Sequence, residues 1–117
     1  MTANPTRPEV ASVSAGPREL SLSFKVPASL LWFRGHFEHH PILPGVVQLA
    51  WAMDFAREHF GFDPAVERVT ALKFLRVIRP EAELMLDLDW SPDERALDFR
   101  FSERDTTCSS GRFILAR

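Results

Sequence analysis

Residues 33–53 read FRGHFEHHPILPGVVQLAWAM, and this stretch divides into two parts at Pro44. Its first part holds Gly35 and Pro41, which neither a long helix nor a regular strand accommodates, so we expect an ordered loop. From Gly45 the sequence changes to good helix formers, which continue until Gly61. Proline favours the start of a helix and glycine follows its end, so the sequence predicts one helix over residues 45–60.

The predicted helix is apolar around most of its circumference. At about 100° per residue, its large apolar side chains point in almost every direction. These side chains are Val46, Val47, Leu49, Trp51, Met53, Phe55 and Phe60. A surface helix carries its apolar residues on one stripe. We therefore expect the rest of the chain to wrap around this helix, and a dimer or larger assembly to cover what remains.

Strand-like segments lie on both sides of the helix in the sequence. Before it, ELSLSFKV (residues 19–26) alternates apolar and polar residues, as a half-buried strand does. After it come four segments separated by turn signals: VERVTALKFLRVI, ELMLDLDW, ALDFRF and GRFILA. We expect these four to form an antiparallel meander. A curved sheet folded round one buried helix is an α+β arrangement, the hotdog fold.

Length and composition limit the class of protein. A chain of 117 residues is expected to form one domain. Its 14 Lys and Arg against 16 Asp and Glu give a net charge of −2, and phosphate-backbone binding usually requires a strongly basic protein. We therefore exclude nucleic acid as a partner. Cys108 is the lone cysteine, so no intrachain disulfide is available, which fits a reducing cytoplasm, and we expect its thiol to be inert.

Residues 1–18 precede the first predicted strand. They contain Pro5, Pro8, Gly16 and Pro17, so we expect a flexible arm followed by a domain over residues 19–117. The arm has neither the charged start nor the apolar stretch of a signal peptide. No apolar run of about 18 residues, long enough to cross a bilayer, occurs in the sequence. The expected location is the cytoplasm, with no membrane span.

The stretch quoted above resembles the signature of the 3-hydroxyacyl-[acyl-carrier-protein] dehydratases, the FabA/FabZ type of hotdog enzyme. That motif reads approximately G-H-F-P-x-x-P-x-x-P-G-x-x-x-x-[ED]. The matching residues are Gly35, His36, Phe37, Pro41, Pro44 and Gly45, followed by Val46. The form L-P-G-V-V-Q-L-x-W is similar to small dehydratases of aryl-polyene pathways, the ApeI-like subgroup. The resemblance implies loss of water from 3-hydroxyacyl thioesters on the phosphopantetheine arm of acyl carrier protein, with no other cofactor.

β-Elimination of water needs a base for the C2 proton, a group that stabilises the enolate oxygen, and an acid for the departing hydroxide. His36 suits the first task, because the unperturbed pKa of a histidine side chain, about 6.5, leaves a neutral imidazole available at cytoplasmic pH. Gly45 suits the second, because an N–H at a helix start is unpaired and the missing side chain permits close approach. The alternatives are a structural loop histidine and a turn glycine.

The third task reveals a departure from the motif. The family's acidic residue corresponds to Ala50 in this chain. Asp54 lies one turn further on the same helix face, so it could act through a water. A salt bridge from Asp54 to Arg57 is the alternative role for this carboxylate. In a further scheme His36 takes the C2 proton and returns it to the hydroxyl.

Glu38, His39 and His40 also depart from the motif and bring further titratable groups beside His36. No second cluster of His, Cys or Asp accompanies them, so we expect no metal and assign His39 and His40 to solvent or to the pocket mouth.

The resemblance also implies binding surfaces. An acyl tunnel would be lined by Phe33, Phe37, Leu43, Pro44 and Val46, unless these residues are plain core. Lys73, Arg76 and Arg79 would bind the acidic carrier protein, unless they form a solvated strand face. Hotdog domains of this length place their sites at a dimer interface, so a homodimer or higher homo-oligomer is implied.

The expected activity is therefore that of a 3-hydroxyacyl-[acyl-carrier-protein] dehydratase in fatty-acid or polyene biosynthesis. Two alternatives remain open. One is a hotdog subunit that binds acyl chains but is inactive or dependent on a partner, and the other is a hotdog thioesterase.

Overall fold

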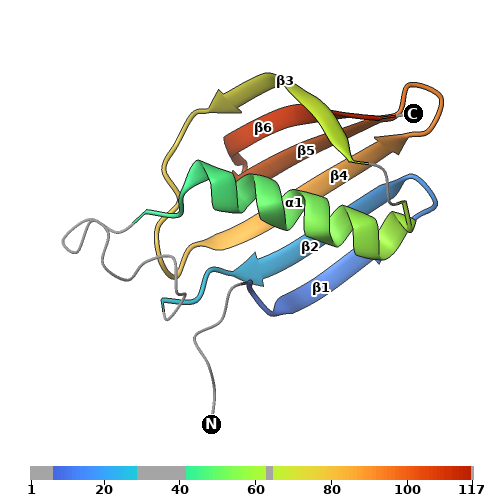
Figure 1. Ribbon diagram of the computed structural model, residues 1–117. Coiled ribbons are helices and arrows are strands. Elements are labelled where there is room, and N and C mark those ends of the chain that lie inside the picture. The colour runs from blue at the N-terminus through green and yellow to red at the C-terminus, as the bar shows by residue number, and fades with distance from the viewer. Residues whose placement is uncertain (1–6, 29–41, 63–64, 117) are drawn as a thin grey trace, which may run out of the picture.

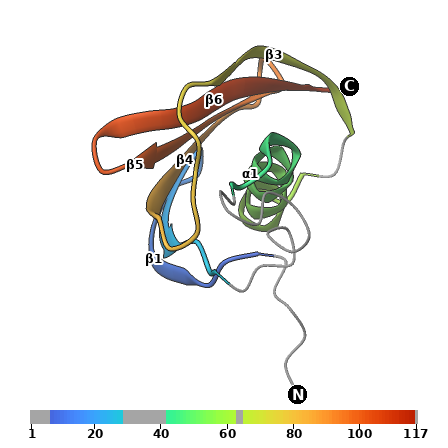
Figure 2. The same ribbon diagram turned by 90° about the vertical axis from the view of Figure 1, so that its left-hand side faces the viewer.

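The computed structural model describes residues 7–28, 42–62 and 65–116. Within them, a six-stranded antiparallel sheet curves around one helix, α1 (Figure 1). Viewed along the helix, the sheet curls round it, so that α1 lies on the concave side (Figure 2). The predicted α+β hotdog architecture is confirmed.

Helix α1 spans Gly45–Phe60, as predicted from its flanking residues. Pro44 stands before it in an extended conformation, and Gly61 ends it with a φ of 74°, which glycine adopts at no steric cost. The side chains that face the sheet are buried: Val47, Gln48, Trp51, Ala52, Met53, Phe55 and Ala56. Val46, Ala50 and Asp54 are exposed. One chain therefore covers one face of the helix and leaves the other open.

The sheet contains strands from both sides of α1 in the sequence. They are β1 (Val10–Ala15), β2 (Glu19–Lys25), β3 (Val66–Phe74), β4 (Glu83–Ser91), β5 (Ala96–Glu103) and β6 (Thr106–Leu115). Their order in the sheet is β1-β2-β4-β5-β6-β3. Buried side chains alternate with more exposed ones along β2 and β4, and β5 is mostly buried. Their buried side chains share one core with α1, where the Phe24 ring meets Trp51 edge-on at 5.9 Å.

The predicted four-strand meander is correct for β4, β5 and β6 only. Strand β3 pairs with β6 instead of β4. The segment 75–82 makes this order possible, because it crosses the end of the sheet. The N–H groups of Leu75 and Arg76 donate to the Cys108 carbonyl of β6, and at the other end the N–H of Glu81 donates to the Val26 carbonyl just after β2.

The predicted boundary at residue 19 is wrong, because β1 belongs to the sheet. Its residues pair with β2 from Val10 opposite Phe24 to Ala15 opposite Leu20. Arg7 forms an ion pair with Glu58 of α1. All six residues of β1 are exposed, so this edge strand lacks the alternation that reveals a half-buried strand in a sequence.

Candidate functional site

The start of α1 offers unpaired backbone donors. The N–H groups of Val47 and Gln48 donate to the Pro44 carbonyl, at 3.1 and 3.2 Å. The N–H groups of Gly45 and Val46 have no acceptor among the residues that the structure describes. Their direction and the helix macrodipole both favour a negatively charged oxygen at this position.

Phe74, at the end of β3, covers Gly45. A Cβ added at Gly45 would lie 2.7 Å from the Phe74 Cζ atom and 2.9 Å from Cε1, closer than carbon atoms pack. Only glycine therefore fits beneath the ring as it stands. Phe74 was not among the residues proposed from the sequence, because its contact with Gly45 depends on the pairing of β3 with β6.

Gln48 and Ser109 link the same turn to the sheet. The Gln48 Nε2 donates to the Leu43 carbonyl at 3.1 Å, and the Ser109 hydroxyl donates to the Gln48 Oε1 at 2.6 Å. Gln48 is 3% exposed and Ser109 is fully buried. We refer to this chain of hydrogen bonds as the Gln48 clamp. Its two side chains are 61 residues apart, so no local pattern could have paired them.

Several predicted site residues lie outside the described residues. They are Phe33, His36, Phe37, His39 and His40. Of the predicted tunnel residues that are described, Leu43 is buried in the core, Pro44 is half-buried and Val46 is 72% exposed. Leu43, Pro44 and Val46 flank Gly45 in the sequence, and their role in lining an acyl tunnel stays a prediction.

Ala50 and Asp54 lie on the open face of α1. Both are exposed, and Asp54 follows Ala50 by one turn, about 6 Å along the axis. Within the described ranges, no ion pair joins Asp54 to Arg57, so the predicted salt bridge is not formed. Position 50, where the motif has an acid, therefore lies on the face of α1 that is turned away from the sheet.

An apolar surface borders the helix start. We call it the β3 surface, and it consists of Val46, Leu72, Phe74, Leu75 and Val77, all of them at least 41% exposed. Strand β3 is an edge of the sheet, so its outer side has backbone groups without a strand partner. Exposed apolar groups on an edge strand are typical of an interface.

The predicted carrier-binding residues are exposed and near one another in the sequence. Lys73 lies on β3, and Arg76 and Arg79 line a depression of about 630 Å³ together with Glu81 and Glu103. Among the described residues, none of these three cations forms an ion pair. Their positive charges are therefore available to an acidic partner.

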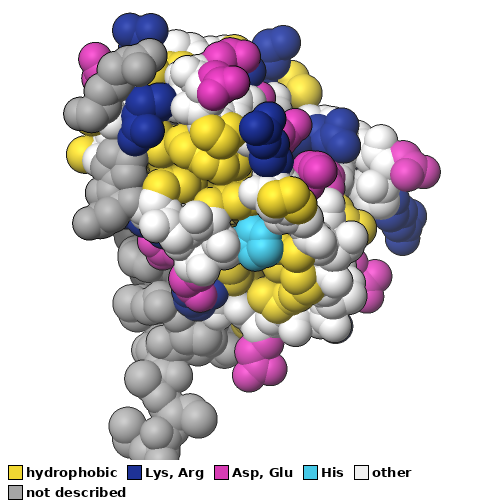
Figure 3. Space-filling model, turned by 90° about the vertical axis from the view of Figure 1, so that its right-hand side faces the viewer, with side chains coloured by type: hydrophobic (Ala, Val, Ile, Leu, Met, Phe, Trp, Pro, Cys, Tyr) yellow, Lys and Arg dark blue, Asp and Glu magenta, His cyan; other side chains and the backbone are white. Residues whose placement is uncertain are grey.

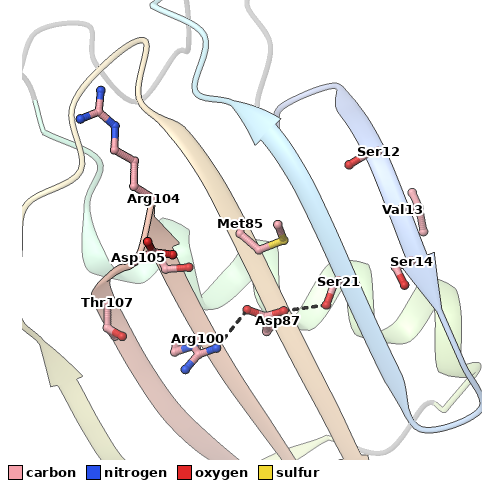
Figure 4. Close-up of a pocket in the computed structure, with 11 residues that line it drawn as sticks. Ser12, Val13, Ser14, Ser21, Met85, Asp87, Arg100, Arg104, Asp105 and Thr107 are labelled. Atoms are coloured by element: carbon pink, nitrogen blue, oxygen red, sulfur yellow. Dashed lines mark hydrogen bonds and ion pairs between the residues drawn. The ribbon is translucent and has the colours of Figure 1, made fainter.

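Two further surfaces lie away from the start of α1. On the face of the sheet turned away from α1, a depression of about 520 Å³ contains Asp87, which accepts a hydrogen bond from Ser21 and pairs with Arg100 (Figure 4). The end of the molecule that carries the helix C-terminus shows hydrophobic side chains among charged ones (Figure 3). The His59 ring is hydrogen-bonded to the Gly16 carbonyl.

The remaining predictions concern the thiol, metal and membrane. Burial raises the pKa of the Cys108 thiol, and the neighbouring Glu103 raises it further, so Cys108 is protonated and a weak nucleophile at neutral pH. No cluster of three or more metal-ligating side chains occurs in the described parts of the chain. No helix of residues 7–28, 42–62 or 65–116 has the length and hydropathy needed to span a membrane.

A curved antiparallel sheet with helix α1 on its concave side, and with the start of that helix beside an edge strand, is the arrangement of a hotdog domain. The sequence matches the ApeI-like family, described as ApeI dehydratase, over residues 12–112. The chain therefore belongs to the ApeI-like dehydratase family.

Solved structures support this assignment. The dehydratase heterocomplex ApeI:P from Xenorhabdus doucetiae contains a chain with a TM-score of 0.89 and 28% identity, covering 95% of this chain and 99% of that one. An uncharacterised protein from Erwinia carotovora subsp. atroseptica has a TM-score of 0.78 and 32% identity, with 92% of each chain covered. A hypothetical thioesterase with coenzyme A from Streptococcus pneumoniae TIGR4, 10% identical with a TM-score of 0.67 over 92% of this chain and 82% of that one, shares the fold. No curated protein matches the sequence.

Proposed function

We propose that the protein dehydrates 3-hydroxyacyl thioesters on acyl carrier protein to trans-2-enoyl thioesters, in fatty-acid or polyene-type biosynthesis in the cytoplasm. The observation that carries the proposal is that the N–H groups of Gly45 and Val46 have no acceptor among the described residues, at the motif glycine of a chain in a dehydratase family. His36, nine residues earlier in the same motif, is the proposed base for the C2 proton.

The helix start suits the chemistry of this step. Removing the C2 proton moves negative charge onto the thioester oxygen, and donors fixed in advance stabilise that charge without reorganising. One such donor is typically worth about 10²–10³ in rate. Glycine at position 45 lets the Phe74 ring pack against the helix start, where the ring covers one side of Gly45.

The proposed mechanism needs an acid for the departing hydroxide, and Ala50 stands where the motif has that acid. Asp54 is the carboxylate one turn away on the same open face, and it would act through a water. A second hotdog subunit packed on that face could supply an acid instead. The similar chain from Xenorhabdus doucetiae is part of the dehydratase heterocomplex ApeI:P, and this observation favours a second candidate function for the present chain, that of a partner-dependent dehydratase subunit.

We propose that the β3 surface is where a second subunit packs, giving a homodimer or a higher homo-oligomer. Its apolar side chains and unpaired strand edge would both be covered by such contact. Lys73, Arg76 and Arg79 are then the proposed contacts for the acidic carrier protein. Its phosphopantetheine arm would deliver the acyl chain to Leu43, Pro44, Val46 and the motif phenylalanines Phe33 and Phe37, and no other cofactor is needed.

The test is incubation of the protein with 3-hydroxyacyl carrier protein of several chain lengths, followed by mass spectrometry of the acylated carrier. Loss of one water, absent with His36→Ala, would support the proposal. Release of free carrier thiol would indicate a thioesterase instead. Tight binding of the acylated carrier without either product would indicate the acyl-binding subunit, and activity that appears only with a second hotdog chain would indicate partner dependence.

A further inference from the structure

We propose that Gln48 is a positioning residue, which together with Ser109 holds the Leu43 carbonyl and thereby fixes the Pro44-Gly45 turn that receives the thioester oxygen. The inference rests on the proposed function, and it assigns a role to two residues that take no direct part in the chemistry.

The burial of the Gln48 clamp requires an explanation. Gln48 is 3% exposed and Ser109 is fully buried, in a core that is otherwise apolar at this depth. A buried amide is costly unless its polar atoms are paired, and an apolar side chain of similar size would avoid that cost. Each end of the Gln48 amide has a partner, so the polar pair is retained with its hydrogen bonds satisfied.

Leu43 is the residue that the clamp controls. Its carbonyl accepts from the Gln48 Nε2 at 3.1 Å, and its N–H donates to the Ile78 carbonyl at 2.7 Å. The Leu43 backbone is thus held on both sides. Only Pro44 separates Leu43 from Gly45, and its ring fixes φ at −60°, so the orientation of Leu43 is passed directly to the Gly45 N–H.

Ser109 holds the other end of the amide. It lies on β6 opposite Phe101 of β5 and Phe74 of β3, so its backbone is held by strands on both sides. The Leu43 carbonyl can only accept, so the Nε2 points to Leu43 and the Oε1 accepts from the Ser109 hydroxyl; the reversed amide would place the Oε1 against the Leu43 oxygen. Ser109 is therefore both a member of the Gln48 clamp and the strand partner of Phe74, the residue that covers Gly45.

Such a role has a specific kinetic consequence. A donor displaced by about 1 Å loses much of its effect on the transition state, while contacts to the acyl chain and the carrier remain. Loss of the clamp should therefore lower kcat and leave KM nearly unchanged, a division that a general loss of stability would not produce.

The experiment compares Gln48→Met and Ser109→Ala with Ser102→Ala. Ser102 provides the matched control, because it is a nearly buried strand serine that lines the depression on the opposite face of the sheet. We expect kcat to fall about tenfold or more for Gln48→Met and about threefold or more for Ser109→Ala, with KM within about twofold. Ser102→Ala should retain wild-type kcat.

A kcat within twofold of wild type for both clamp variants would overturn the proposal, and if Gln48→Met does not fold, Ser109→Ala decides alone. Amide hydrogen exchange in the absence of substrate separates this result from failure of the proposed function. With the clamp removed, the Leu43 N–H should exchange about tenfold faster than in the Ser102→Ala control. Unchanged protection of Leu43 would overturn the clamp even if the wild-type protein shows no dehydration.

Discussion

Gly45→Ala tests the link between the helix start and catalysis. The new Cβ would lie 2.7, 2.9 and 3.2 Å from three atoms of the Phe74 ring, so the ring must move. Phe74 is half exposed, which allows it to swing outward. Overpacking typically costs about 1–3 kcal/mol, and alanine regains about 0.5–1 kcal/mol relative to glycine in a helix. The net loss of about 0–2.5 kcal/mol corresponds to a Tm lowered by at most about 10 °C.

The effect on activity should be much larger than the effect on stability. The methyl group would stand beside the Gly45 N–H and displace the Phe74 ring, and it would thereby narrow the approach of the thioester oxygen. Loss of one such donor lowers rates by about 10²–10³, so we expect kcat for 3-hydroxyacyl carrier protein to fall by about 10² or more. Both kcat and Tm should be measured on the same preparations.

Two further variants distinguish the possible causes. Gly16→Ala is the matched control, since its Cβ would meet only the Glu19 carboxylate at 3.6 Å, and it should change neither kcat nor Tm appreciably. Combining Gly45→Ala with Phe74→Ala removes the clash, and kcat should still remain about 10² below that of Phe74→Ala alone. If the combined variant recovers the activity of Phe74→Ala, the reasoning about oxygen approach is refuted.

His36→Ala should abolish dehydration while leaving the circular dichroism spectrum and Tm intact, and near-wild-type turnover would contradict its assignment as base. Asp54→Asn should lower kcat about 10²-fold if the carboxylate acts through a water, because the amide has no acidic proton, whereas a loss below about threefold would remove Asp54 from the mechanism. Ala50→Glu should raise kcat if the pocket keeps the geometry of the motif, and no gain would indicate a rebuilt site. Sedimentation should show a dimer or larger, and Leu75→Asp with Val77→Asp should yield monomers; a monomeric wild type at micromolar concentration would argue against the β3 surface as an interface.

Local chemistry explains why the sequence predicted the helix and most strands. The helix ends depend on Pro44 and on the positive φ of Gly61, which are properties of single residues. Alternation in the segment 19–26 reflects burial on one face and is visible in any half-buried strand. The edge strand β1 was missed because its six residues are all exposed, so its sequence lacks this alternation.

Contacts between distant residues required the tertiary structure. Strand β3 lies beside β6 because the segment 75–82 crosses the end of the sheet, and neither hydrophobic pattern nor turn signals specify that path. The ring of Phe74 over Gly45 follows from this strand order, and the hydrogen bond from Ser109 to Gln48 follows from the packing of α1 against β6. The motif around Gly45 could thus be recognised in the sequence, because its residues are close together along the chain. The residues that surround it could not, because strand pairing brings together residues that are far apart in the sequence, and no hydrophobic periodicity indicates such contacts.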